Sequence, residues 1–257
     1  MTATGMTFVL SSCDDDLFAL GRQIPELGIT IKDAKCVSHL ARLGRSIHSV
    51  TMSEDMGFVT IGVNSGVLLG WGNNSWGELG KTESRKDRVK KVTFRKFESQ
   101  GDSPKISNPN EIEPLILNVV SRNHVTIYHT NKGIYSLGNK LSGLLGYQPP
   151  EGIQVNPIKL HLPINVEIQG VSVSVKHAVA WDTQGRGYAW GINQYGILGI
   201  KENRKRQDHK IISPEPIAVL ENSRILNLYA CDSCTFAISH KGKVFYWGRY
   251  DEINIGY

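Results

Sequence analysis

The sequence predicts an all-β protein assembled from about five tandem repeats. The first observation is a pair of glycines that recurs five times, with a separation of seven residues in the first copy and eight in the others. The second is an apolar run that ends at the first glycine of each pair, and the third is a strand-like run and turn before it. Self-similarity at a period of 50-odd residues is typical of a repeat array.

The glycine pairs occupy fixed places in the repeat, and successive first glycines are 51, 66, 53 and 57 residues apart. The pairs are Gly21 and Gly28, Gly72 and Gly80, Gly138 and Gly146, Gly191 and Gly199, and Gly248 and Gly256. Gly suits turns that need positive φ and places where two backbones approach closely. A large apolar residue precedes each first glycine: Leu20, Trp71, Leu137, Trp190 and Trp247. We expect these residues to fill the space between adjacent sheets.

Each repeat predicts a two-stranded hairpin. In four copies a strand is expected to begin fourteen residues before the first glycine, at Phe58, His124, His177 and Cys234. It reaches a Gly-containing turn, and a second strand then runs into the first glycine. The first copy uses Asp14, Asp15 and Asp16 as its turn. The predicted hairpin units are 7–28, 58–80, 124–146, 177–199 and 234–256, within one repeat-built domain of residues 1–257.

The segments between the hairpins predict further strands. Strand-like runs lie at 30–40, 112–121, 155–175 and 214–230, and Pro occurs near the start of three of them. Because Pro suits the first residue or the edge of a strand, we expect outer strands that complete four-stranded sheets. A helix over 30–43 is an alternative. The insertion at 81–111 is expected to be a basic, flexible loop.

The repeat resembles that of the regulator of chromosome condensation family. The pattern Gly-Trp-Gly-x-Asn-x-x-Gly-x-Leu-Gly is matched closely at 70–80 and nearly as well at 189–199. The resemblance implies a β-propeller in which each repeat contributes to one blade, usually of seven. Five hairpins leave too little chain for seven blades, so we expect a fragment or a divergent truncated member. A closed ring of five blades is the alternative.

Composition narrows the class of protein. A chain of 257 residues with 40% hydrophobic content can bury a sizeable core. The N-terminus has no basic region before a long apolar stretch, and no apolar run is long enough to predict a membrane span. Four Cys do not suggest a disulfide scaffold. These features favour a cytoplasmic or nuclear protein.

No catalytic residue, cofactor or metal is expected. The sequence contains no phosphate-binding loop motif, no H-E-x-x-H and no G-x-S-x-G. Cys231 and Cys234 form an isolated C-x-x-C, which could be half of a zinc site or a redox pair. The repeat register explains them more simply as packing residues, and it explains His124 and His177 in the same way.

Two basic runs suggest a binding surface. Residues 81–96 contain eight Lys or Arg and two acidic residues. Residues 201–210 contain five Lys or Arg and two acidic residues, whereas the whole chain carries a net charge of only +5. Both runs follow the second glycine of their repeats and are therefore expected on the same side of the fold, where they would attract acidic partners. A solvated loop is the alternative. The predicted contact residues are Trp76, Tyr195, Lys90, Lys91, Arg95, Arg204, Lys205 and Arg206.

The favoured function is a protein-interaction module or adaptor. In the resembling family, the founding member promotes nucleotide exchange on a Ran-type small GTPase and docks on chromatin, so guanine-nucleotide exchange is the first alternative. Exchange needs a loop that enters the nucleotide site of the GTPase, and loose candidates are Asp14 to Asp16, Asp182 and Asp232. Nucleic-acid binding through the basic runs is the second alternative.

Overall fold

A computed structural model of the protein consists of five antiparallel β-sheets and confirms the all-β propeller class. The residues that the structure describes are 2–3, 6–10, 17–21, 35–36, 47–52, 56–61, 67–72, 74–80, 90–92, 114–149, 152–163, 166–201, 210–221 and 223–249.

Within these described ranges, four sheets contain four strands each, and the last contains three. The first sheet comprises β1 (Thr2–Ala3), β2 (Met6–Leu10), β3 (Leu17–Gly21) and β4 (Lys35–Cys36). The second comprises β5 (Ile47–Met52), β6 (Met56–Ile61), β7 (Val67–Gly72) and β8 (Lys90–Val92). The third comprises β9 (Ile116–Arg122), β10 (Val125–Thr130), β11 (Gly133–Asn139) and β12 (Ile153–Lys159). The fourth comprises β13 (Ile168–Val173), β14 (His177–Asp182), β15 (Gly187–Ile192) and β16 (Lys210–Pro216). The fifth comprises β17 (Ile225–Ala230), β18 (Cys234–Ser239) and β19 (Val244–Gly248).

Short 3₁₀ turns follow several of these strands. They are η2 (Lys140–Ser142), η3 (Gln194–Gly196) and η4 (Ala218–Leu220).

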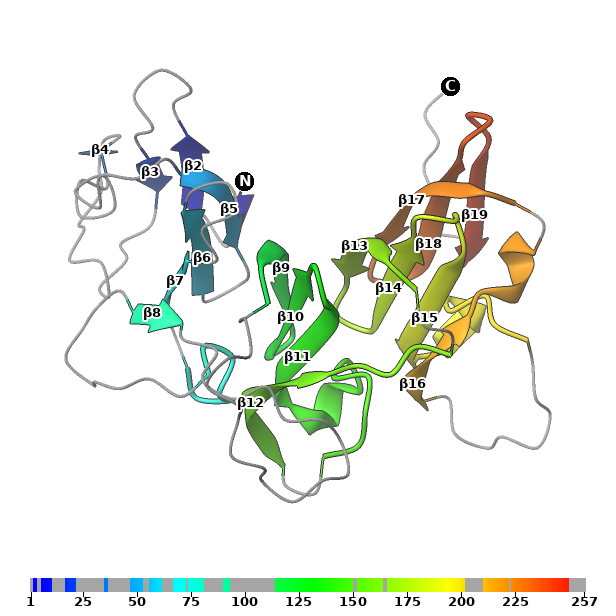
Figure 1. Ribbon diagram of the computed structural model, residues 1–257, viewed down its shortest axis with the longest axis horizontal. Helices are drawn as coiled ribbons and strands as arrows, with labels where there is room; N and C mark the ends of the chain where they lie inside the picture. Colours follow the sequence, from blue (N-terminus) through cyan, green and yellow to red (C-terminus); the bar gives the residue numbers. More distant parts are fainter. Residues whose placement is uncertain are drawn as a thin grey trace.

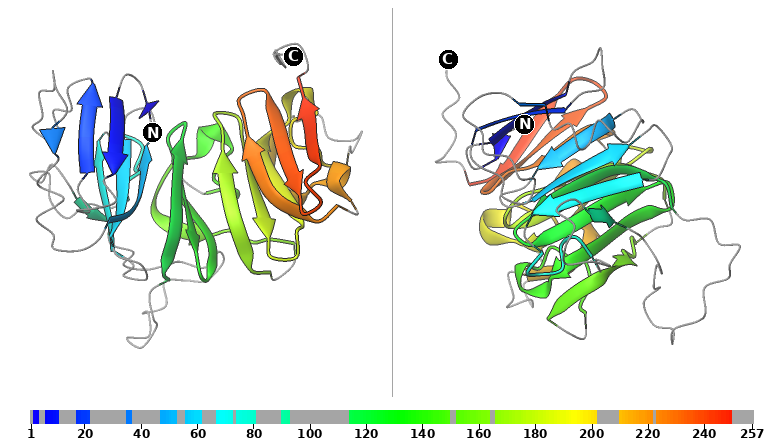
Figure 2. Two further views of the ribbon diagram at one scale, coloured as in Figure 1. Left: turned by 90° about the horizontal axis from the view of Figure 1, so that it is seen from above. Right: turned by 90° about the vertical axis from the view of Figure 1, so that its left-hand side faces the viewer.

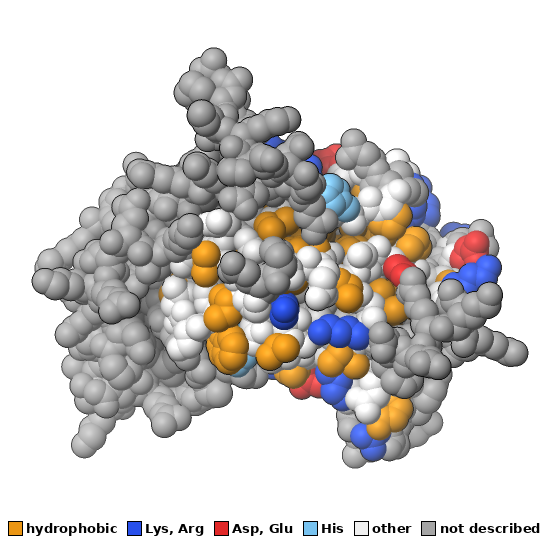
Figure 3. Space-filling model, turned by 90° about the horizontal axis from the view of Figure 1, so that it is seen from below, with side chains coloured by type: hydrophobic (Ala, Val, Ile, Leu, Met, Phe, Trp, Pro, Cys, Tyr) orange, Lys and Arg blue, Asp and Glu red, His pale blue; other side chains and the backbone are white. Residues whose placement is uncertain are grey.

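The five sheets stand side by side along an open arc, with β1–β4 and β17–β19 at its two ends (Figure 1). The strands follow chain order within every sheet, and β5, β9, β13 and β17 contact one another along the inner side of the arc (Figure 2). The last strand of each four-stranded sheet lies toward the outer edge of the arc (Figure 1). The described surface seen from below Figure 1 carries hydrophobic side chains interspersed with Lys and Arg (Figure 3). None of β1–β4 pairs with β17–β19, and these two sheets lie apart in Figure 1, so the described sheets form an open arc and not the closed five-blade ring that was the alternative.

The links between sheets contain more than the predicted outer strands. The run at 155–175 includes the end of β12, an outer strand, and all of β13, the inner strand of the next sheet. The run at 112–121 supplies most of the inner strand β9. A helix over 30–43 was the alternative to a strand in this segment, and the described part of it, Lys35–Cys36, is a strand. Each link leads from the outer edge of one sheet to the inner edge of the next. A single link can therefore contain both the outer strand of one sheet and the inner strand of the following sheet.

The strand register also differs from the even spacing that the sequence predicts. Gly191 pairs with His177 and Gly248 with Cys234, as expected, but Gly138 pairs with Val125 and not with His124. The turn before β10 contains an additional residue in the left-handed region, since both Asn123 (φ 47°) and His124 (φ 61°) have positive φ. His124 therefore does not occupy the slot of His177. In the second sheet the residue opposite Gly72 is Met56, two residues before Phe58.

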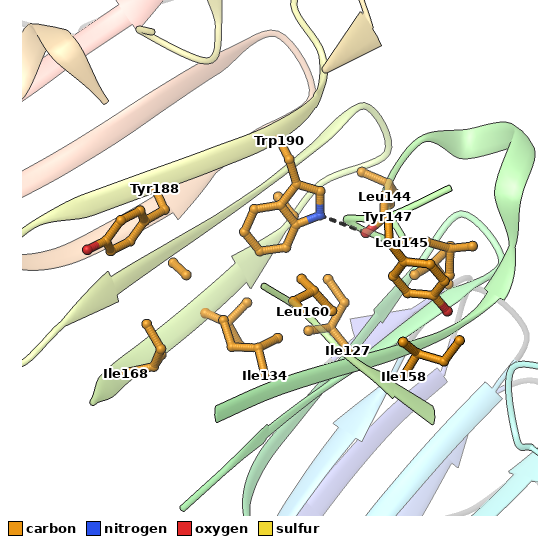
Figure 4. Packing of buried hydrophobic residues seen from close by; sticks show 14 residues of the cluster. Ile127, Ile134, Leu144, Leu145, Tyr147, Ile158, Leu160, Ile168, Tyr188 and Trp190 are labelled. Atoms are coloured by element: carbon orange, nitrogen blue, oxygen red, sulfur yellow. Dashed lines mark hydrogen bonds between the residues drawn. The ribbon is translucent and has the colours of Figure 1, made fainter. Parts of the chain in front are cut away.

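The tryptophan of the repeat joins one sheet to the loop of the sheet before it. Trp190 is fully buried, and its indole Nε1 donates a hydrogen bond of 2.8 Å to the carbonyl of Leu144, which follows β11 (Figure 4). Trp247 donates in the same way to the carbonyl of Ile197, at 2.9 Å. Gly199 follows that loop with φ +60°, and a Cβ there would lie 2.7 Å from Nε1 of Trp247. The second glycine of the motif therefore leaves room for the next sheet's tryptophan.

The hydrophobic core is divided into layers between successive sheets. One cluster lies between the second and third sheets and includes Leu68 and Tyr128. A second lies between the third and fourth sheets and includes Ile127 and Trp190, and a third lies between the fourth and fifth sheets and includes Trp181. Each sheet is therefore stabilised mainly by its neighbours, as expected of a repeat array.

His177 forms a buried polar link between the fourth and fifth sheets. Its side chain is inaccessible, its Nε2 lies 2.7 Å from Oγ1 of Thr235, and its Nδ1 lies 3.0 Å from Oγ of Ser174. Because the Thr235 hydroxyl donates to the carbonyl of Ile197, it accepts the proton carried by Nε2. Burial lowers the pKa of His177 to about 4, although the charge of Asp232 acts in the opposite direction. The ring is therefore neutral at physiological pH.

Replacing Trp190 with Phe should lower the free energy of unfolding by about 2 kcal/mol, because the buried carbonyl of Leu144 loses its donor. Urea unfolding followed by circular dichroism measures this change. Trp76→Phe is the control, since Trp76 is only partly buried and no described residue accepts a hydrogen bond from its indole. Equal losses in the two variants would contradict the role of the Trp190 hydrogen bond.

Stability should fall as the pH is lowered from 6.5 toward 4. The unfolded chain binds a proton on His177 near pH 6.5, whereas the folded chain binds it only near pH 4. The contribution of His177 to the free energy of unfolding is therefore fully present above pH 6.5 and is lost progressively as the pH falls toward 4. His177→Gln cannot titrate, so it should flatten the dependence of unfolding free energy on pH by up to about 3 kcal/mol over this window.

Urea unfolding at a series of pH values tests the prediction, with His161→Gln at an exposed position as the control. His129, whose pKa is also lowered by burial, should retain part of the slope in both variants. The same slope in His177→Gln as in the wild type would refute it.

Candidate binding face

The loops of the glycine motif gather on one face of the arc. β9, β13 and β17 are the first strands of sheets with the same strand order, and their C-terminal ends lead into the first turn of each sheet. The loops that leave β11 and β15 return to the same side, because adjacent strands are antiparallel. We call this side the motif face. Its described parts are the turns 122–124, 174–176 and 231–233 and the loops 74–80, 140–149 and 193–201.

A repeated asparagine shapes two of these loops. The side-chain oxygen of Asn74 accepts a hydrogen bond from the backbone N–H of Leu79 at 2.8 Å, and Asn193 accepts one from Leu198 at 3.0 Å. Each bond spans five residues and closes the loop on itself. The sequence motif contains this Asn, but its role was not predicted. Its recurrence in the same slot of two repeats was the available signal.

Trp76 lies against the turn of the next sheet. Its ring centroid is 5.6 Å from that of His124, and Nδ1 of His124 lies 3.1 Å from Oε1 of Glu78. Glu78 is almost completely buried, and its other oxygen accepts a hydrogen bond from the backbone N–H of Trp76. The structure therefore places Trp76 in a polar cluster that holds the loop onto β9 and β10, with part of the indole still accessible.

Tyr195 occupies the equivalent slot and is more exposed. It retains 55% of its accessible surface, has φ 59°, and lies beneath the guanidinium of Arg249 at 5.4 Å from the ring centroid. Leu141 on the neighbouring loop is 69% exposed, and the ammonium group of Lys210 donates hydrogen bonds to the carbonyls of Lys140 and Leu141. Large apolar side chains and cationic groups therefore alternate along this face, which suits recognition of another protein.

A recess of about 450 Å³ lies on the inner side of the arc between the ends of the inner strands. Its lining includes Arg122, Ser172, Ser174 and Asp232. Asp232 is exposed, and its carboxylate accepts a hydrogen bond of 3.3 Å from the backbone N–H of Val175 in the neighbouring sheet. The recess was not predicted, since its walls come from strands more than fifty residues apart in sequence.

Asp182 does not lie at this site. It is buried at the end of β14, where it accepts hydrogen bonds from Arg186 Nε at 2.7 Å and from the Tyr188 hydroxyl at 3.0 Å. Burial alone would raise the pKa of Asp182, but the hydrogen bonds from Arg186 and Tyr188 outweigh it and hold the pKa below its ordinary value. The geometry makes Asp182 a structural residue of the β14–β15 turn, on the side opposite the motif face. Asp14 to Asp16 lie outside the described residues.

Most of the predicted basic contact residues fall outside the described part of the chain. Lys90 and Lys91 belong to the backbone of β8, whereas Arg95, Arg204, Lys205 and Arg206 are not described. The run at 201–210 connects β15 to β16, and the run at 81–96 begins in the connection from β7 to β8. Both connections join the third strand of a sheet to its fourth, so their described ends lie on the motif face.

The described residues show no group of three or more His, Cys, Asp or Glu with the arrangement of a metal site. Cys231 and Cys234 are thiols that flank the β17–β18 turn, where the N–H of Cys231 donates to the carbonyl of Cys234 at 3.0 Å. Across the described ranges, no helix has the length and apolar character needed to cross a membrane.

Comparisons with known proteins agree with the repeat motif. The chain is 27% identical to protein pim1 of Schizosaccharomyces pombe over 218 residues, which cover 79% of this chain and 35% of pim1. It is 24% identical to the ultraviolet-B receptor UVR8 of Arabidopsis thaliana over 202 residues, which cover 79% of this chain and 39% of UVR8. The chain thus spans less than half the length of these relatives. No family model matches it.

The crystal structure of Prp20p, the yeast RCC1, from Saccharomyces cerevisiae superposes with a TM-score of 0.72. The superposition covers 95% of this chain and 56% of Prp20p at 16% sequence identity, so it shows a common fold. The recurrent glycine pairs, the tryptophan contacts between sheets and these relatives lead to one conclusion: the chain is similar in its repeat to the regulator of chromosome condensation (RCC1-like) proteins and shares their β-propeller fold.

Proposed function

We propose that this chain is a protein-interaction module that binds a partner through the motif face. The observation that carries the proposal is the exposure of Leu141 and Tyr195 beside cationic groups on one side of a rigid array of sheets. Aromatic and apolar side chains with a charged rim are typical of protein interfaces. The loops that carry them are fixed by Asn193 and by contacts with the following sheet, so little ordering cost accompanies binding.

Charge favours an acidic partner. The described part of the motif face, with the start of β16 and the end of β19, contains six Lys or Arg and two acidic residues, and one of these, Glu78, is buried. The proposed contacts from Lys90, Lys91, Arg95, Arg204, Lys205 and Arg206 would add to this positive potential. Such a surface accelerates association with an acidic surface and weakens as salt is added.

The same charge is compatible with nucleic acid, but the chain has no recognised nucleic-acid-binding motif, and we therefore place the protein partner first. A cytoplasmic or nuclear location remains a prediction.

Removing the exposed apolar contacts should abolish partner binding without loss of stability. The double variant Leu141→Ala and Tyr195→Ala is compared with Leu117→Ala, an exposed leucine at the opposite end of β9. Affinity capture with quantitative mass spectrometry should show at least one partner that the wild type and Leu117→Ala retain and the double variant loses. Retention of that partner should decrease as salt is raised. An identical set of captured proteins for all three chains would refute the proposal.

A finer candidate function is guanine-nucleotide exchange on a Ran-type GTPase. Prp20p is described together with its binding properties to Gsp1p and histones, which supports testing a GTPase first. Asp232 is the residue we propose to act, because its carboxylate is exposed at a recess that opens beside the motif face. Exchange requires tighter binding to the nucleotide-free GTPase than to the loaded form.

The exchange function predicts that substoichiometric amounts of the chain accelerate release of fluorescent GDP from a Ran-type GTPase. Asp232→Ala should reduce the acceleration at least tenfold, which corresponds to about 1.4 kcal/mol. Glu221→Gln, an exposed carboxylate in the link between β16 and β17, is the control and should leave the rate unchanged. No acceleration by the wild type would exclude exchange on that GTPase and leave the interaction module untouched.

A further inference from the structure

Two cysteines stand at the ends of the turn between β17 and β18. The antiparallel pairing of these strands continues into the turn, where the backbone N–H of Cys231 donates a hydrogen bond of 3.0 Å to the carbonyl of Cys234. Only Asp232 and Ser233 lie between them. Hydrogen-bonded residues that are opposite each other have Cα atoms about 5.5 Å apart, and a disulfide bridges Cα atoms about 4.4–6.8 Å apart. The backbone therefore holds the two thiols at a spacing that a disulfide can bridge.

The equivalent turn of the fourth sheet shows how side chains at these two positions are directed. By strand register, Ser174 and His177 correspond to Cys231 and Cys234. Their turn has the same length and the same closing bond, since the N–H of Ser174 donates to the carbonyl of His177 at 2.8 Å. The two side chains meet there, and Oγ of Ser174 lies 3.0 Å from Nδ1 of His177. A turn with this backbone therefore directs the thiols of Cys231 and Cys234 toward each other.

The two thiols differ in accessibility. Cys231 is partly exposed and belongs to the lining of the recess, next to Asp232. Cys234 is only 9% exposed. In thiol–disulfide exchange, an accessible thiol meets the oxidant first and a neighbouring thiol then completes the new bond. The turn thus combines an accessible thiol with a resolving thiol, which is the arrangement found in redox-sensing cysteine pairs.

The turn between the cysteines is anchored on two sides. The carboxylate of Asp232 accepts a hydrogen bond of 3.3 Å from the N–H of Val175 in the preceding sheet. The carbonyl of Ser233 accepts one of 2.9 Å from the N–H of Arg249, which follows β19. These contacts fix the turn before any bond forms between the sulfur atoms. Closure of the ring therefore needs little further ordering of the backbone.

We propose that Cys231 and Cys234 form a reversible disulfide that closes the β17–β18 turn. The oxidant is a small-molecule disulfide such as oxidised glutathione. The thiolate of Cys231 attacks one sulfur of the oxidant, and one glutathione thiolate leaves. The thiolate of Cys234 then attacks Sγ of Cys231 and displaces the second glutathione thiolate. The pair loses two electrons and two protons, and one molecule of oxidised glutathione becomes two molecules of the reduced form.

The disulfide acts on the wall of the recess. Cys231 and Asp232 both line this recess, and the new bond closes a ring that contains Asp232. A link between the two ends of a turn restricts the opening of that turn. A disulfide at a partly exposed turn is of the labile kind that reducing agents open again. The redox state of the pair therefore sets how firmly Asp232 is held, whatever partner the motif face binds.

Equilibration of the full chain with mixtures of reduced and oxidised glutathione tests the bond. After acid quenching and alkylation of the thiols, trypsin releases both cysteines in one peptide, residues 225–241, which is identified by mass spectrometry. This peptide should change from the doubly alkylated form to one with neither an alkyl group nor glutathione, and dithiothreitol should restore it. Cys36→Ser is the matched control and should give the same transition as the wild type.

Single-cysteine variants test the order of the two steps. Cys234→Ser retains the accessible thiol and should accumulate a mixed disulfide between Cys231 and glutathione. Cys231→Ser retains the buried thiol and should remain alkylated at every ratio of the two glutathione forms. Thermal melting checks that each variant is folded, and Cys234→Ala replaces Cys234→Ser if that variant is unfolded.

The contribution of the fold is measured by repeating the titration in urea. The equilibrium constant for ring closure with oxidised glutathione should be at least about tenfold larger in the folded chain than in the unfolded chain. Hydrogen exchange at the N–H of Cys231 should become about tenfold slower after oxidation, because the closed turn opens less often. A wild-type peptide that stays alkylated in oxidised glutathione alone would overturn the proposal. So would equal constants in the two states, or unchanged hydrogen exchange.

Discussion

The described structure depends on one contact, in which the tryptophan of the fourth or fifth sheet packs against the loop of the sheet before it. Trp190 is fully buried between two sheets and donates a hydrogen bond to Leu144, and Trp247 repeats the arrangement with Ile197. A four-stranded sheet has two faces to bury, and neither can be buried within the sheet itself. The tryptophan buries a large apolar surface and supplies the donor for a loop carbonyl that would otherwise be unpaired. The contact thus buries apolar surface and also gives a buried carbonyl its hydrogen bond.

The same contact explains why the motif face is suited to binding. The loops at 140–149 and 193–201 cannot move freely, because each is held by the sheet that follows it. Side chains that these loops expose, such as Leu141 and Tyr195, are therefore presented on a fixed frame. The buried contacts of the frame constrain the residues that make them, whereas exposed loop positions can differ in size and charge without disturbing the sheets. Function in such a protein resides in the loops, and the sheets determine where the loops lie.

The features that could be predicted from sequence are those encoded locally. Glycine pairs and apolar runs act over about fifteen residues, and they located the hairpins and the tryptophans between sheets. The strand register at β10 could not be predicted in this way. His124 adopts a left-handed conformation and lengthens the turn by one residue, but the spacing of the glycine motif is the same with or without this change. The inner and outer strands were merged for a similar reason, since both lie in segments without glycine markers.

The candidate site was predicted in part. Tyr195 and Trp76 were identified as one slot, but their different exposure depends on the next sheet, which contributes Arg249 in one case and His124 in the other. Asp182 and Asp232 looked alike as turn carboxylates, and only the fold separates them. The first is enclosed by Arg186 and Tyr188, whereas the second borders the recess. When residues from different sheets come together in space, a single sequence contains no pattern that shows that they are neighbours.

The direction of the tryptophan contact has a consequence for how the chain is made. In both described cases a loop is completed by a residue about fifty positions downstream, since Leu144 receives its hydrogen bond from Trp190 and Ile197 receives its hydrogen bond from Trp247. During synthesis, the newest sheet on the ribosome therefore has its closing loop unsecured until the following repeat has emerged. Folding from the N-terminus should proceed in steps of one repeat, each lagging the polypeptide by a repeat's length.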